Sequence, residues 1–172
     1  MYKVLGFILI MAGCTGLGMW YSVQFRLHIR NLKQMCHILM LMEGQVRFGR
    51  STLPECCMQI AQRVEEPFKS SLEEIYENVN KNNGSSFGQV SRDCYERKLK
   101  KLVVSEKEKE GFIACFANAG FEEDDMQIQN IAQERQELET DLEELNKSLA
   151  SRCKLAMSLG TMSGVLLMIL FL

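Results

Sequence analysis

Two pairs of residues have side chains that could bind a metal ion. Cys36 precedes His37, and Cys56 precedes Cys57. Thiolates and imidazoles are the ligands that zinc prefers, but only when about four of them converge on one point. The spacing does not bring the two pairs together, and adjacent side chains of a helix point about 100° apart. The odd total of seven cysteines and the lack of a C-x-x-C motif also argue against a disulfide framework. We interpret the cysteines as small buried residues in a reducing compartment and expect no bound metal.

Nothing else in the sequence predicts catalysis. His28 and His37 do not share a helix face, and no P-loop, G-x-S-x-G or H-E-x-x-H motif occurs. The net charge of -2 provides no basic field for nucleic acid. We therefore expect no enzyme, no cofactor and no nucleic-acid partner. A set of acidic residues is interpreted mostly as a solvated helix face: Glu134, Glu137, Glu139, Asp141, Glu143 and Glu144.

A basic stretch is the candidate for partner contact. It consists of Arg97, Lys98, Lys100 and Lys101, and the acidic run from Glu122 to Asp125 follows it in the chain. Segregated charge of this kind can steer and orient a docking partner. The stretch could instead contact lipid headgroups or simply be solvated, and the sequence leaves these alternatives open.

The two ends of the chain are apolar and uncharged. Residues 4–23 form a segment of about 20 residues, and residues 155–172 would span about 27 Å as a helix. Both lengths suit a transmembrane helix. A cleaved signal peptide is the alternative for the first segment, but its apolar stretch is long for that role. Gly160 and Gly164 form one G-x-x-x-G step, which predicts a helix-packing face or arises by chance.

Basic residues predict the orientation of the chain in the membrane. They flank the two spans on the side of the central domain. Arg26, Arg30 and Lys33 follow the first span, and Lys147, Arg152 and Lys154 precede the second. Cytoplasmic flanks carry an excess of Lys and Arg. We therefore expect residues 24–153 to be a cytoplasmic domain and both termini to lie across the membrane.

Residues 24–153 read as a bundle of about six helices. Apolar residues recur at helical spacing, and an amphipathic helix continues out of the first span to about Phe48. Thr52 with Glu55, and Ser105 with Glu108, form capping boxes that begin later helices. Residues 78–86 are rich in turn formers and predict a linker. The fold class expected is all-α, membrane-anchored, with a transmembrane helix at each end.

The last helix is expected to run without a break from about Asp125 into the second apolar segment. Its apolar residues follow a heptad pattern with Arg135 in the seam, so it could form a coiled coil with another copy or pack on its own domain. The seam consists of Ile128, Ile131, Arg135, Leu138, Leu142, Leu145 and Leu149.

Three stretches resemble the stage III sporulation protein AB family of endospore-forming bacteria. Residues 5–13 are similar to its glycine-rich opening anchor, residues 46–55 to its "I-x-Y-G-x-T-P-L-P-E" segment, and residues 158–167 to its closing "Y-L-G-x-L-x-G-L" segment. Gln127 and Ile131 also stand where the family has Gln and Ile. Thr52 stands where Pro is usual and Tyr95 where Trp is usual, which are departures from the pattern.

The resemblance implies a structural part, and not an enzyme. The family belongs to the secretion-like channel between mother cell and forespore, and its soluble domain is similar to that of the type II secretion platform protein. This implies a location in the mother-cell membrane around the forespore. It also implies contacts with a secretion-type ATPase, with other stage III channel proteins and with membrane lipid, besides a possible homo-oligomer. The alternative from another class is a membrane-tethered coiled-coil signalling or scaffold protein.

Overall fold

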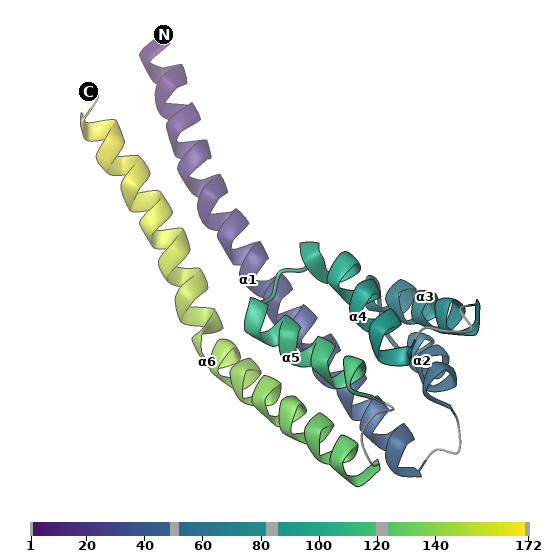
Figure 1. Ribbon diagram of the computed structural model, residues 1–172. Helices are drawn as coiled ribbons and strands as arrows, with labels where there is room; N and C mark the ends of the chain where they lie inside the picture. Colours follow the sequence, from purple (N-terminus) through teal and green to yellow (C-terminus); the bar gives the residue numbers. More distant parts are fainter. Residues whose placement is uncertain (1, 49–51, 82–85, 120–123, 171–172) are drawn as a thin grey trace. The chain divides into compact units, whose positions relative to one another are not determined.

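The computed structural model describes the backbone of residues 2–48, 52–81, 86–119 and 124–170 (Figure 1). Within these ranges every regular element is helical and there is no β-strand, so the predicted all-α fold is confirmed. The elements are α1 (Tyr2–Phe48), α2 (Leu53–Ala61), α3 (Phe68–Lys81), α4 (Phe87–Lys98), the 3-10 helix η1 (Leu99–Lys101), α5 (Glu106–Ala117) and α6 (Asp124–Leu170).

The chain divides into two compact units. One consists of Met1–Ile29 and Glu143–Leu172, and the other consists of Arg30–Leu142. For most residues of the two predicted membrane spans, including Gly160 and Gly164, the structure does not describe what surrounds them. Among the described residues, no helix combines the length and the apolar character needed to cross a membrane. The two spans, the domain boundaries and the helix-packing role of the glycines therefore stay predictions.

Helix α1 continues to Phe48, as its apolar periodicity predicted. In the second unit its buried side chains recur at steps of three and four residues: Leu32, Met35, Cys36, Ile38, Leu39 and Met42. Such a set covers one broad face of a helix, which must pack against other elements to be removed from water. Helix α1 therefore contributes one wall of the interior of this unit.

The short helices begin where the sequence places capping residues. The backbone N–H of Thr52 donates to the Glu55 carboxylate at 2.8 Å before α2, and that of Ser105 donates to Glu108 at 2.6 Å before α5. The Ser105 hydroxyl in turn accepts from the Glu108 N–H at 3.3 Å. These bonds satisfy N–H groups that have no partner within the helix. Both predicted capping boxes are thus present, and they fix where α2 and α5 begin.

The linker predicted over residues 78–86 is shorter than expected. Residues 78–81 belong to the last turn of α3, and Ser86 caps α4 by accepting from the Gln89 N–H at 3.3 Å. Residues 82–85 lie outside the described ranges. Asn and Lys are tolerated in the last turn of a helix. In this turn the Lys81 Nζ also lies 2.8 Å from Glu77 Oε2. The helix therefore continues to Lys81 although these residues are common in turns.

The interior of the second unit is centred on four aromatic side chains. Phe68 comes from α3, Tyr95 from α4, and Phe112 and Phe116 from α5, and none is more than 1% exposed. The Phe112 ring centroid lies 5.9 Å from that of Phe68, 5.3 Å from Tyr95 and 5.2 Å from Phe116. Aromatic pairs at such distances attract each other beyond the effect of the area they bury. The cluster therefore joins α3, α4 and α5.

The Tyr95 hydroxyl is buried in this cluster and has no hydrogen-bond partner among the described residues. The same burial raises the pKa of Tyr95 well above its ordinary value. A buried hydroxyl without a partner carries an uncompensated desolvation cost. Tyr95→Phe should therefore raise the free energy of unfolding by about 1 kcal/mol. Urea denaturation followed by helical circular dichroism measures this, with Tyr76→Phe as the control on a half-buried tyrosine; a clear loss of stability would contradict it.

Residues 131–138 of the heptad seam on α6 pack within the second unit. Ile131 and Leu138 are each 1% exposed. Arg135, which interrupts the seam, donates from Nε to Glu43 of α1 at 3.3 Å and from Nη1 to Glu139 at 2.6 Å. This favours the second of the two interpretations of the seam, packing on the chain's own domain, over residues 131–138.

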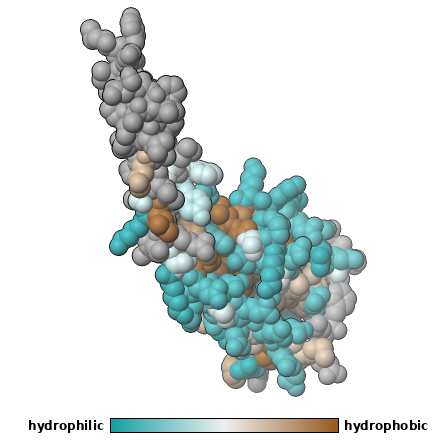
Figure 2. All heavy atoms as spheres, turned by 90° about the vertical axis from the view of Figure 1, so that its left-hand side faces the viewer, coloured by the Kyte–Doolittle hydropathy of each residue, from teal (hydrophilic) through white to brown (hydrophobic). Residues whose placement is uncertain are grey.

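One face of the second unit is mainly hydrophilic (Figure 2). Figure 2 shows hydrophilic side chains over most of the face in view, with smaller apolar areas between them. Surfaces of this kind remain solvated, and specific contacts then depend on local grooves and charges.

Candidate partner-binding site

The structure separates the four residues of the predicted basic stretch into two pairs. Arg97 and Lys98 lie in the last turn of α4, and both pair with Glu74 of α3; the Lys98 Nζ lies 3.1 Å from Glu74 Oε2. Lys100 and Lys101 lie in η1, and both are exposed. No ion pair joins either of them to another residue that the structure describes. Two of the four cations thus connect α4 to α3, and the other two are available at the surface.

The other candidate groups are not assembled into a site. Among the residues described, no three His, Cys, Asp or Glu side chains are placed to hold a metal ion. Cys36 is buried while His37, its neighbour on α1, is exposed. Of the acidic run from Glu122 to Asp125, residues 122 and 123 lie outside the described ranges, as does the side chain of Asp124.

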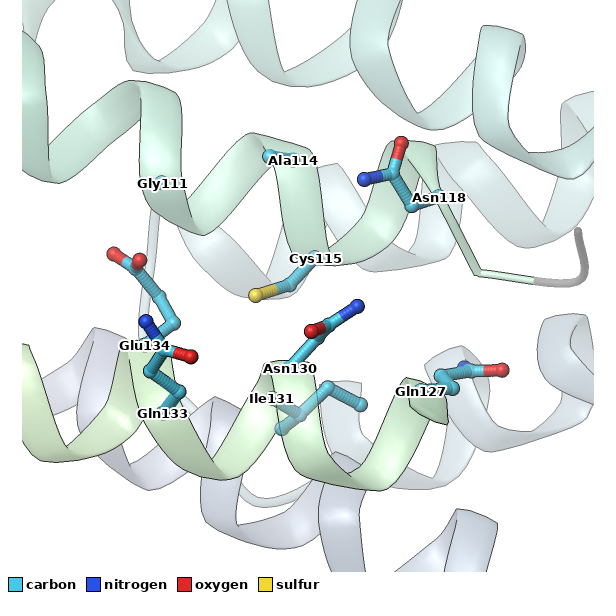
Figure 3. A pocket seen from close by; sticks show the side chains of 9 residues that line it. All are labelled: Gly111, Ala114, Cys115, Asn118, Gln127, Asn130, Ile131, Gln133 and Glu134. Carbon is cyan, nitrogen blue, oxygen red and sulfur yellow. The ribbon is translucent and has the colours of Figure 1, made fainter. Parts of the chain in front are cut away.

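A groove between α5 and α6 is the feature that the sequence did not predict. Its volume is about 290 Å³. Figure 3 shows the Glu134 carboxylate and the Asn130 amide extending from α6 toward α5, and the Cys115 sulfur extending from α5 toward α6. Nine residues line it: Gly111, Ala114, Cys115 and Asn118 on α5, and Gln127, Asn130, Ile131, Gln133 and Glu134 on α6.

The groove depends on small residues of α5. Gly111, Ala114 and Cys115 follow one another at helical spacing, so they leave space that longer side chains would fill. A Cβ on Gly111 would lie 2.1 Å from Glu134 Oε1, which is closer than real atoms approach. Only glycine at position 111 therefore allows the Glu134 carboxylate to lie over the backbone of α5 in this conformation.

Gln127 is a buried polar group at one end of the groove. It is 4% exposed, and its Nε2 has no hydrogen-bond partner among the described residues. Figure 3 places it toward the end of the groove that Asn118 also lines. A buried donor that is left unpaired costs about 1–3 kcal/mol. A ligand that brought an acceptor oxygen to this end of the groove would remove that cost.

The charge of the groove is negative. Burial raises the pKa of Glu134, and the carboxylates of Glu137 and Asp141 raise it further, whereas the Lys107 cation lowers it. Lys107 lies outside the groove, where its Nζ is 3.5 Å from Glu137 Oε2. No cationic side chain is among the described residues that line the groove. A cation placed at Glu134 would therefore be attracted, and an anion would be repelled.

Sequence reasoning missed this groove because its residues have no chemistry in common. The signals that could have indicated it are a glycine in the interior of a predicted helix, at position 111, and the amides of α6 at spacings of three residues, at 127, 130 and 133. Gln127 matches the family pattern and Ile131 also belongs to the heptad seam, but neither pattern predicts a groove. The groove's lining depends on which faces of α5 and α6 meet, and this the spacing does not specify.

Comparison with known proteins gives a family and a fold. The family model described as stage III sporulation protein AB matches residues 3–172. A solved structure described as "Stage III sporulation protein AB (SpoIIIAB)" is similar with a TM-score of 0.65 and 16% sequence identity; the match covers 72% of this chain and 97% of that chain. Comparison with curated proteins finds no match. The structural likeness, at this identity, shows the shared fold, whereas the family match spans almost the whole sequence. The chain therefore belongs to the stage III sporulation protein AB family.

Proposed function

We propose that the protein is a structural membrane component of the secretion-like channel between mother cell and forespore, and that endospore formation requires it. The family match over residues 3–172 is the observation that carries this proposal. The apolar segments at residues 4–23 and 155–172 support a helix in the membrane at each end, and the basic residues that flank them support a cytoplasmic domain in the mother cell.

The second unit would act as a platform that contacts a secretion-type ATPase and membrane ring proteins. Two features support a docking role: hydrophilic side chains cover most of the face shown in Figure 2, and the two lysines of η1 are exposed. A domain held at the membrane at both ends cannot diffuse to a soluble substrate, so it acts through the proteins that come to it.

Charge reversal of the exposed lysines tests this docking role. Lys100→Glu with Lys101→Glu should reduce co-purification of the ATPase and spore yield, because these two cations are exposed and pair with no other described residue. Helix content should not change. Co-purification from sporulating cells and counts of heat-resistant spores measure the two effects.

A matched control separates docking from folding. Arg97→Glu with Lys98→Glu makes the same change of charge but also breaks both pairs with Glu74. Partly exposed pairs of this kind contribute about 0–1 kcal/mol each, so this variant should stay folded with lower stability. If the Lys100 and Lys101 variant co-purifies the ATPase and sporulates as the unchanged protein does, the basic stretch is solvated surface. If the unchanged protein itself recovers no channel protein, the proposed function is wrong.

A further inference from the structure

Besides the groove between α5 and α6, two further grooves of the second unit are large enough to receive part of a partner, and the smaller of them, of about 460 Å³, is lined by residues of α3 and α4. The larger, of about 780 Å³, lies between α4 and α5 and is lined by three cations and three carboxylates. Two of these cations already have partners, since Arg92 Nη1 lies 3.7 Å from Glu96 Oε1 and Lys109 Nζ lies 2.8 Å from Glu106 Oε1. Its charges are thus balanced within the chain, and nothing in it calls for a ligand of a particular charge.

The groove between α5 and α6 differs because its polar groups are not balanced. Its one charged lining residue is the half-buried Glu134, and Glu137 and Asp141 add to the negative potential. At the other end, the buried Gln127 Nε2 is a donor without a partner among the described residues. A ligand that satisfies both ends carries a cation at one end and an acceptor oxygen at the other.

We propose that this groove binds an extended segment of a protein partner, with a lysine or arginine of that segment at Glu134 and a backbone carbonyl of it at Gln127. The proposal rests on the proposed function in one respect, that the partner belongs to the same channel assembly.

The lining fits a peptide backbone better than other ligands. Asn118 and Gln133 carry side-chain amides, which like peptide units have both donors and an acceptor, and one Gln133 donor is used by Glu137 Oε1 at 3.4 Å. The volume of about 290 Å³ takes a few residues and not a helix, which with its side chains is about 10 Å across. An anionic ligand finds no cation in the lining, and a metal ion finds one carboxylate.

Site-specific crosslinking in the full-length protein identifies the occupant. A photoreactive amino acid replaces Asn130 in sporulating cells, and mass spectrometry maps the residue that it captures. Replacement of Glu110, which is exposed on α5 outside this groove, is the matched control. We expect position 130, and not position 110, to capture one segment that contains a lysine or arginine. Capture of a segment without a basic residue, of lipid, or of nothing overturns the proposal.

Charge exchange then tests the contact at Glu134. Glu134→Lys should lower recovery of the captured partner at least about tenfold, since it places like charges together in a partly buried site. Glu134→Gln should have a smaller effect, and Glu110→Lys should have none. Changing the captured lysine or arginine to glutamate should restore recovery with Glu134→Lys.

The outcomes separate this proposal from the proposed function. If the Glu134→Lys protein recovers every channel partner at the level of the unchanged protein, the groove is not the contact, while the proposed function stands. If recovery falls but the exchanged partner does not restore it, the effect is not a paired charge and the assignment of a cation to Glu134 is wrong. If the unchanged protein recovers no channel partner, both are wrong.

Discussion

Phe112→Ala should lower the free energy of unfolding by about 3–5 kcal/mol. The side chain is fully buried, and its ring contacts those of Phe68, Tyr95 and Phe116, from α3, α4 and α5. Truncation removes the buried area and leaves a cavity that the three helices cannot fully close. Urea denaturation of the full-length protein, followed by circular dichroism, measures the loss.

The matched control is Phe48→Ala, at the end of α1. Phe48 is 82% exposed, so its truncation should change stability by less than about 0.5 kcal/mol. Phe112→Leu keeps most of the side-chain volume, so its loss of stability should lie between those of Phe112→Ala and Phe48→Ala. Because total stabilities are about 5–15 kcal/mol, the Phe112→Ala protein should also be less abundant in cells and give fewer spores. A Phe112→Ala protein as stable as the Phe48→Ala protein would show that the aromatic cluster does not hold these helices together.

Cys36 should react with iodoacetamide about a hundredfold more slowly at pH 8 than an ordinary thiol, because the thiolate is the reactive form. Burial raises the pKa of Cys36 from 9.0 to about 11, and the carboxylate of Glu139 adds to the effect. The rate should then increase about tenfold for each pH unit until the pH approaches that pKa. Mass spectrometry of the peptide that contains Cys36, sampled over time, measures the rate.

The control for Cys36 is a cysteine introduced at an exposed site of the same helix. Met40 is 50% exposed, so Met40→Cys should react at an ordinary rate in the same sample. The pKa of Cys36 in the folded protein lies above its value in the unfolded chain, so the folded state holds its proton more tightly. The stability that results is fully present below pH 9 and is lost as the pH rises toward 11. Equal rates at positions 36 and 40 would contradict the burial of this thiol.

The two surface sites would make different contributions to the proposed docking role. The lysines of η1 are exposed, and exposed charges mainly steer and orient a partner. The groove between α5 and α6 is partly buried and holds a donor without a partner in the described part of the chain, and such groups contribute to how long a partner stays bound. Variants at Lys100 and Lys101 should therefore act mainly on the association rate, and variants at Glu134 mainly on dissociation.

The sequence by itself determined which segments are helical and where several of them begin. Apolar spacing predicted α1 to Phe48, and the Thr52–Glu55 and Ser105–Glu108 patterns predicted the starts of α2 and α5. These features depend on residues that are neighbours along the chain, so local interactions suffice to specify them. The same applies to the family, which was recognised from short stretches in a fixed order and which the match over residues 3–172 confirms.

Only the tertiary structure decided which side chains of these helices are buried, which are paired and which remain exposed. The buried face of α1 is broad and includes Met35, Ile38 and Met42, because other elements cover it. Arg97 and Lys98 pair with Glu74, and the Glu134 carboxylate lies over the backbone of Gly111. In each case the partners lie more than 20 residues apart, and which faces meet depends on the packing of the whole unit. Local spacing carries no information on that packing, so the charges that remain available to a partner could not be predicted from sequence.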